Sequence, residues 1–157
     1  MAAFFASTSD DTLGQVTSGK RYWSDGTNVA GQQFEYLFDD IGNRLSASSG
    51  GDETGANLRV QAYTANNLNQ YTQRTVPGYV DVFGTATNTS TVTVNQQSTY
   101  RHGDYYRAEL SVDNSSAALW VGVTNVAVTP EAFAYDADGN LTNDGRWLTP
   151  GMPRTGS

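Results

Sequence analysis

The only histidine of the chain, His102, lies two positions before an aspartate, Asp104. If residues 100–110 form one strand, both side chains point to the same face, with Cα atoms about 7 Å apart. A histidine and a carboxylate at that distance can share a metal ion or activate a water molecule, so His102 and Asp104 are the candidate catalytic residues. The alternative is a turn over Arg101–Asp104 that leads into a strand, and the presence of a single histidine favours this alternative.

A second candidate site is a run of oxygen-bearing side chains near the end of the sequence. It consists of Asp136, Asp138, Asn140 and Asp144. Carboxylates and amides in such clusters suit Ca²⁺, so these four are candidate metal ligands and Ca²⁺ is the candidate cofactor. The run is not an EF-hand loop, because Gly139 comes too early and Trp147 stands where that loop needs a glutamate. The alternative is a polar turn in which aspartate accepts hydrogen bonds from backbone amides.

Aromatic side chains give a third candidate, because their planes stack on the apolar faces of sugars. The candidates are Tyr22, Trp23, Tyr79, Tyr105, Tyr106 and Trp120. Packing between neighbouring hairpins explains the same residues, and it is the favoured explanation.

The elements that carry these residues are predicted to be strands. The chain has 16 glycines, nine tyrosines and many Thr, Val and Asn residues, which suits pleated strands joined by tight turns, and no long window shows helical spacing of apolar residues. Residues 133–147 alternate at strand period around the turn Asp136–Asn140, and residues 34–45 repeat this pattern. We therefore predict an all-β fold of antiparallel hairpins.

The two copies of aromatic-Asp-x-x-Gly-Asn-x-Leu resemble the tyrosine-aspartate (YD) repeats of Rhs proteins and teneurins. The resemblance implies structural turns at Asp39, Gly42, Asn43, Asp136, Gly139 and Asn140. Two degenerate copies are predicted at Asp11, which lacks the preceding aromatic, and at Thr64, with Asn67 in the place of glycine. The anchors are then 28, 25 and 72 positions apart, and the first two spacings fall in the range of repeat proteins.

The long third spacing is predicted to hold an inserted β-meander or sandwich module. The resulting division is a tail at 1–10, YD-repeat-like hairpins at 11–75, the inserted module at 76–129, a further hairpin at 130–148 and a C-terminal tail at 149–157. Residues 46–55 are Ser/Gly-rich and are interpreted as a flexible loop. Two prolines after Leu148 interrupt the array.

The net charge of −7 disfavours binding to nucleic acid, because an acidic surface repels phosphate. No stretch is long and apolar enough to enter a membrane, and no signal peptide is evident, so a soluble chain is expected and its location stays open. The absence of cysteine leaves the redox compartment open as well.

These patterns predict a non-catalytic fragment of a bacterial Rhs-type shell that serves as a scaffold or interaction surface. Two clear and two degenerate hairpins cannot close a shell, so exposed sheet edges are expected to pair with another copy. One alternative is a small Ca²⁺-dependent hydrolase of an ester or lactone, built on His102 and Asp104. The other is a carbohydrate-binding module over residues 76–129.

Overall fold

The computed structural model describes residues 4–121, 124–126 and 130–143, and it confirms the predicted all-β class, because those residues contain no helix. The strands are β1 (Phe4–Asp10), β2 (Val16–Trp23), β3 (Asn28–Phe38), β4 (Arg44–Gly50), β5 (Leu58–Ala65), β6 (Tyr71–Arg74), β7 (Tyr79–Thr85), β8 (Thr93–Val94), β9 (Gln97–Ser98), β10 (Tyr100–His102), β11 (Tyr105–Ser111), β12 (Leu119–Val121), β13 (Thr124–Val126), β14 (Glu131–Ala132), β15 (Ala134–Tyr135) and β16 (Leu141–Asn143). No described element is a helix that could cross a bilayer.

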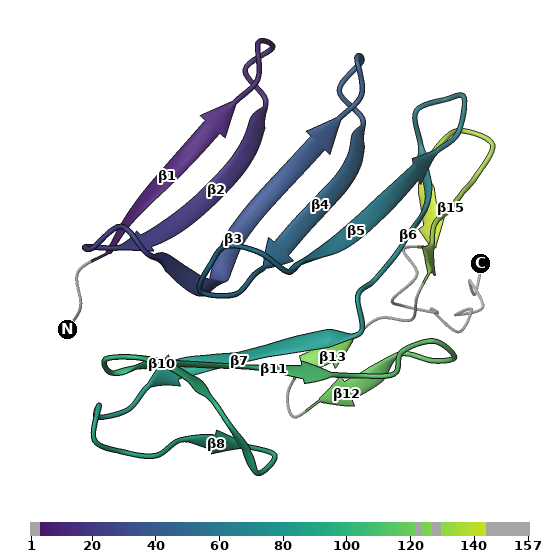
Figure 1. The fold of residues 1–157 in the computed structure, drawn as a ribbon. Coiled ribbons are helices and arrows are strands. Elements are labelled where there is room, and N and C mark those ends of the chain that lie inside the picture. The colour runs from purple at the N-terminus through teal and green to yellow at the C-terminus, as the bar shows by residue number, and fades with distance from the viewer. Residues whose placement is uncertain (1–3, 122–123, 127–129, 144–157) are drawn as a thin grey trace, which may run out of the picture.

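The largest element is an open antiparallel sheet of seven strands. Strands β1 to β6 follow one another as neighbours (Figure 1), and the short strand β14 pairs with the far side of β6. Each strand is joined to the next by a short turn, so the first six strands form a simple meander. The sheet does not close on itself, and β1 and β14 are its two edge strands in the described part of the chain.

The chain leaves this sheet after β6 and returns to it at β14. Between these two strands it forms a three-stranded antiparallel sheet of order β10-β11-β7 and two small hairpins, β8–β9 and β12–β13. Figure 1 shows β7 and β11 lying across the lower ends of the long strands. The described strands of the predicted inserted module, residues 76–129, pair with one another and not with the seven-stranded sheet, so we keep that name for them.

Two predictions about irregular segments were wrong. Residues 4–10 are not a loose tail, because they pair with β2 from Phe4↔Trp23 to Asp10↔Val16. Residues 46–50 are not a flexible loop, because they belong to β4 and pair on both sides, with β3 and β5. Serine and glycine are tolerated there because the backbone N–H and C=O groups of β4 are hydrogen-bonded by the strands on both sides.

Very few apolar residues are buried. The buried hydrophobic side chains of the described residues are Trp23, Val29, Ala30 and Tyr105, all where the inserted module meets the sheet. Along the rest of the sheet, large apolar side chains stay exposed on both faces, among them Phe34 on one face and Leu37 on the other. The hydrophobic core is therefore the junction between the two sheets, and the faces of the long sheet are uncovered.

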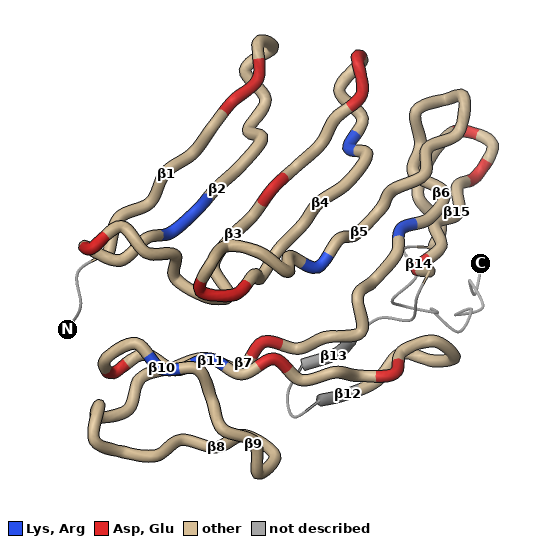
Figure 2. Tube along the Cα trace, in the orientation of Figure 1, with Lys and Arg blue, Asp and Glu red and all other residues tan. Residues whose placement is uncertain are grey.

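Charges follow the secondary structure. Every described Lys or Arg lies on a strand, whereas most acidic residues lie in turns (Figure 2). The two signs meet in ion pairs such as Lys20–Glu35, at 2.5 Å across β2 and β3. A second pair, Arg74–Glu131, joins β6 to β14, and its glutamate is buried.

Candidate functional site

One type of turn recurs along the long sheet and in the β15–β16 hairpin. An anchor residue donates its backbone N–H to the carbonyl four positions on, and its own carbonyl accepts the N–H three positions on. The side-chain oxygen of the anchor accepts the N–H groups two and four positions on, at 2.7 to 3.1 Å. The anchors are Asp11, Asp39, Asp52, Asn66 and Asp136.

The third residue after each anchor has a positive φ, which explains the glycine of the motif. It is glycine in four copies, and Asn69, with φ +60°, in the fifth. The six predicted turn residues occupy the corresponding places of two copies: Asp39, Gly42 and Asn43 in one, and Asp136, Gly139 and Asn140 in the other.

The register of the third predicted copy was wrong by two positions. The anchor is Asn66 and not Thr64, and the residue in the glycine place is Asn69 and not Asn67. Thr64 is still part of β5 and pairs with Gln73. The anchors at this end of the sheet, Asp11, Asp39 and Asn66, are therefore 28 and 27 positions apart.

The turns at this end lie side by side. A Cβ added to Gly42 would be 3.1 Å from the Gln15 amide nitrogen of the preceding turn. Asn43 donates to Asn69 of the next turn at 3.3 Å. A Cβ added to Gly139 would likewise lie 3.2 Å from the side-chain amide nitrogen of Gln70. A row of polar turns thus follows the upper rim of the sheet in Figure 1.

Three of the four candidate calcium ligands, Asp136, Asp138 and Asn140, belong to this row. Both carboxylate oxygens of Asp136 accept hydrogen bonds from within its turn, one from the backbone of Asp138 and Asn140 and the other from the Asn140 side chain. The hydrogen bond from the Asn140 side chain is the main reason that the pKa of Asp136 is lowered. Asp144 lies outside the described residues. Among the described residues, no three His, Asp or Glu side chains converge as metal ligands do.

The same turn chemistry acts most strongly on Asp52. Its carboxylate accepts hydrogen bonds from the Thr54 hydroxyl, at 2.6 Å, and from the Asn57 amide. The Thr54 hydrogen bond makes the largest contribution to lowering the pKa of Asp52, to about 2. These turn carboxylates are therefore hydrogen-bond acceptors that hold the backbone in place.

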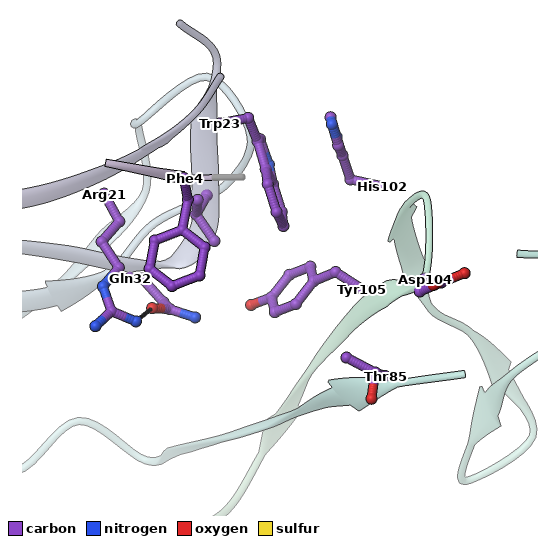
Figure 3. A pocket seen from close by; sticks show the side chains of 9 residues that line it. Phe4, Arg21, Trp23, Gln32, Thr85, His102, Asp104 and Tyr105 are labelled. Atoms are coloured by element: carbon purple, nitrogen blue, oxygen red, sulfur yellow. Dashed lines mark hydrogen bonds between the residues drawn. The ribbon is translucent and has the colours of Figure 1, made fainter. Parts of the chain in front are cut away.

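The candidate catalytic pair is separated by a turn. His102 pairs directly with Tyr105, so Gly103 and Asp104 form the two-residue loop between β10 and β11, and the predicted single strand is not formed. The Asp104 carboxylate accepts the backbone N–H of Asn88 at 3.0 Å. Figure 3 shows the Asp104 side chain pointing away from the His102 ring. This is the alternative of a turn leading into a strand, and the two side chains do not form an acid–base pair.

His102 contacts the long sheet instead. Its ring stacks on Trp23 with centroids 4.3 Å apart and an interplanar angle of 3°. On another side of Trp23 lies Tyr105, in an edge contact of 5.4 Å, and the Tyr105 hydroxyl donates to the Ala30 carbonyl at 2.6 Å. Burial raises the pKa of Tyr105, so its hydroxyl stays a donor.

These rings border a hollow of about 250 Å³ between the inserted module and the sheet, which we call the junction hollow (Figure 3). Its lining residues are Phe4, Arg21, Trp23, Val29, Gln32, Thr85, His102, Asp104 and Tyr105. Trp23 and Tyr105 were among the aromatic residues predicted from the sequence. Phe4 and Gln32 were missed, because the strand alternation shows which residues share a face but not which distant strand covers them.

An ion-pair cluster also joins the two sheets, further along β11. Arg107 of β11 contacts Asp81 of β7, at 2.5 Å, and Glu109, at 2.9 Å. Glu109 also binds Arg59 of β5, whose guanidinium lies 3.8 Å from the Tyr79 ring centroid. Burial opposes ionisation of Glu109, but the hydrogen bonds and charges of the two arginines outweigh it and lower its pKa. Burial raises the pKa of Asp81 in spite of Arg107.

Comparison with models of protein families, with curated proteins and with solved structures found no match to this chain. Functional inference therefore rests on the turns, the uncovered sheet and the junction.

Proposed function

We propose that the chain is a non-catalytic segment of a bacterial Rhs-type YD-repeat shell, acting as a scaffold and interaction surface. The observation that carries the proposal is a long sheet with both faces uncovered, built from turns that repeat one hydrogen-bond pattern. In repeat proteins each unit buries its apolar surface only against its neighbours. Exposed residues such as Phe34, Leu37 and Val60 are the surface that such neighbours would cover.

The edge strand β1 supports self-association. All seven of its residues are exposed, it contains neither lysine nor proline, and its only charge is Asp10 at its end. Natural edge strands usually carry such residues to prevent pairing with other chains. We propose that two copies pair through β1 in antiparallel fashion about its central residue, Ser7, which extends the sheet by the same kind of ladder that joins β1 to β2.

The association state of a Ser7→Asp variant tests this proposal. Across a two-fold axis at position 7 the two new carboxylates would face each other and repel, whereas within one copy the new carboxylate would face Lys20, which is favourable. The wild type should dimerise in sedimentation experiments between about 1 and 500 µM, and the variant should need at least about tenfold more protein. High salt should restore part of its association.

A Ser46→Asp variant is the matched control. Ser46 lies on the same face as Ser7, but on β4, which is paired on both sides. It should dimerise like the wild type. A wild type that stays monomeric over the whole range contradicts the proposed edge pairing.

The Ca²⁺-dependent hydrolase is the competing proposal for function. In it, His102 or Asp104 would activate water, and its support from the sequence was the closeness of these two side chains on one strand. The turn between β10 and β11 separates them and removes that support. Incubation with small esters and lactones, with calcium and again with a chelator, distinguishes the two. The scaffold proposal expects no turnover in either condition, and metal-dependent turnover that His102→Ala abolishes would contradict it.

A further inference from the structure

The junction hollow has rigid aromatic walls. Trp23 is fixed between the parallel ring of His102 and the edge of Tyr105, and the Tyr105 hydroxyl is anchored on Ala30. Phe4 completes the walls from β1, and about half of its surface is exposed. In Figure 3 the rings of Phe4, Trp23 and Tyr105 surround a common space. These contacts hold Trp23 and Tyr105 in place, so binding would order few side chains.

Planar polar groups stand at the rim of the same space. Arg21 donates to the side-chain amide oxygen of Gln32 at 2.6 Å, and its guanidinium lies 4.8 Å from the Phe4 ring centroid. These contacts hold the guanidinium and the amide in fixed orientations. Thr85 adds a hydroxyl from the inserted module. Asp104 also lines the hollow, but its carboxylate is bound to the Asn88 N–H and points away from the three rings (Figure 3). The rim therefore offers both donors and acceptors of hydrogen bonds.

Charge and size restrict the ligand. Arg21 at the rim disfavours cations, while Asp104 and the net charge of −7 disfavour anions such as nucleotides. The volume of about 250 Å³ is below the range of about 300–1,000 Å³ that is usual for drug-sized ligands. A neutral ligand that is no larger than one ring, with an apolar face and hydroxyl groups on its edge, fits both limits.

We propose that the junction hollow binds one neutral sugar ring, stacked on an aromatic wall with its hydroxyls on Gln32 and Arg21. This site differs from the carbohydrate-binding surface considered from the sequence, because half of it comes from the long sheet. The inserted module would then be the second wall of the site, and binding would stabilise its contact with the sheet.

The experiment titrates the protein with glucose, galactose, mannose, N-acetylglucosamine and their methyl glycosides. Because one ring makes few contacts, sugars are added to about 50 mM. Binding is followed by the indole N–H signals in ¹H–¹⁵N spectra and by saturation transfer to the sugar. At least one sugar should shift the Trp23 indole signal in a saturable way. Indole and benzyl alcohol, tested in parallel, should bind more weakly.

Phe4→Ala and Phe5→Ala form a matched pair of variants. The two phenylalanines are neighbours on β1 with almost equal exposure, 52% and 50%, but they point to opposite faces. Phe4→Ala should weaken sugar binding by roughly fivefold to tenfold, and Phe5→Ala should leave it unchanged. Gln32→Ala, which removes a polar rim group and leaves β1 intact, should also weaken binding.

Three results would overturn the proposal. They are the absence of a saturable shift with any of the sugars, preferential binding of the aromatic compounds, and equal effects of Phe4→Ala and Phe5→Ala in variants whose circular dichroism spectra match the wild type.

Discussion

At the scale of single residues, the turn anchor needs a short side chain with one oxygen that can accept the backbone N–H groups two and four positions on. Asn66 makes the same two backbone contacts through its amide oxygen that Asp52 makes through a carboxylate. The geometry therefore does not depend on charge. The charge adds stronger hydrogen bonds, and these favour the ionised form of the aspartate in the folded state.

This preference predicts a stability that depends on pH. The folded-state pKa of Asp52, about 2, lies below the ordinary value of 3.8, so its contribution is complete above 3.8 and is lost as the pH falls towards 2. The free energy of unfolding should therefore decrease between about pH 4 and pH 2. Asp52→Asn should show a shallower decrease, measured by urea unfolding at several pH values, because its side chain does not titrate.

Asp40→Asn is the control for this experiment. Asp40 follows the Asp39 anchor in an equivalent turn and is exposed, and its carboxylate makes no hydrogen bond to any of the described residues. Its variant should keep the wild-type pH dependence. Equal slopes for Asp52→Asn and the wild type would show that the turn does not stabilise the carboxylate.

Much of the turn chemistry could be predicted from the residues, and its exceptions have physical causes. The turns at Asp39 and Asp136 follow from the Asp-x-x-Gly spacing. The Asn66 turn was placed two residues too early. Asparagine can fill both the anchor and the positive-φ position, so the residue types in this segment do not show which asparagine occupies which position. The Asp52 turn was missed because the serines around it resemble a linker, although they pair in β4.

At the scale of elements, the inserted module is held against the sheet by a close backbone approach. Gly31 of β3 has φ +84°, and a Cβ added there would lie 2.8 Å from the Arg107 Nε. Arg107 is also the centre of the ion-pair cluster with Asp81 and Glu109. The glycine thus allows the arginine to lie flat on β3 while it binds both acids.

Gly31→Ala should weaken this docking. Gly26→Ala is the matched control, since Gly26 has φ +86° and a Cβ there would meet nothing within 4 Å. Both variants should lose about 1–2 kcal/mol from backbone strain, and only Gly31→Ala should lose about 1–3 kcal/mol more from the clash with Arg107. Urea unfolding measures both losses, and hydrogen exchange should be faster over β7 and β11 in Gly31→Ala alone.

Equal losses in the two variants would mean that Arg107 moves aside at no cost. Such docking could not have been predicted from the sequence, because contacts such as Tyr105 with Ala30 join residues 75 positions apart and follow no periodic pattern. The only hint in the sequence is Gly31 itself, because a glycine that lies inside a strand, here β3, often marks a close backbone approach.

At the scale of the whole molecule, the small core has a thermodynamic consequence. The heat capacity change of unfolding follows the apolar area that unfolding exposes, and a typical 157-residue chain gives about 2 kcal/mol/K. Here the buried apolar residues are confined to the junction, while side chains such as Leu37 and Val60 are already exposed in the folded chain. The monomer should therefore give less than about 1.5 kcal/mol/K.

Calorimetry tests this expectation. The heat capacity change of unfolding is measured for Ser7→Asp, which is the monomeric reference, and for concentrated wild type. Edge pairing adds mainly backbone hydrogen bonds, so the wild type should melt at a temperature that rises with concentration but should show only a slightly larger heat capacity change per chain. A monomer value at or above about 2 kcal/mol/K would mean that the faces of the sheet are covered in solution. A large increase on association would mean that copies pack face to face through Phe34 or Leu37, and not edge to edge through β1.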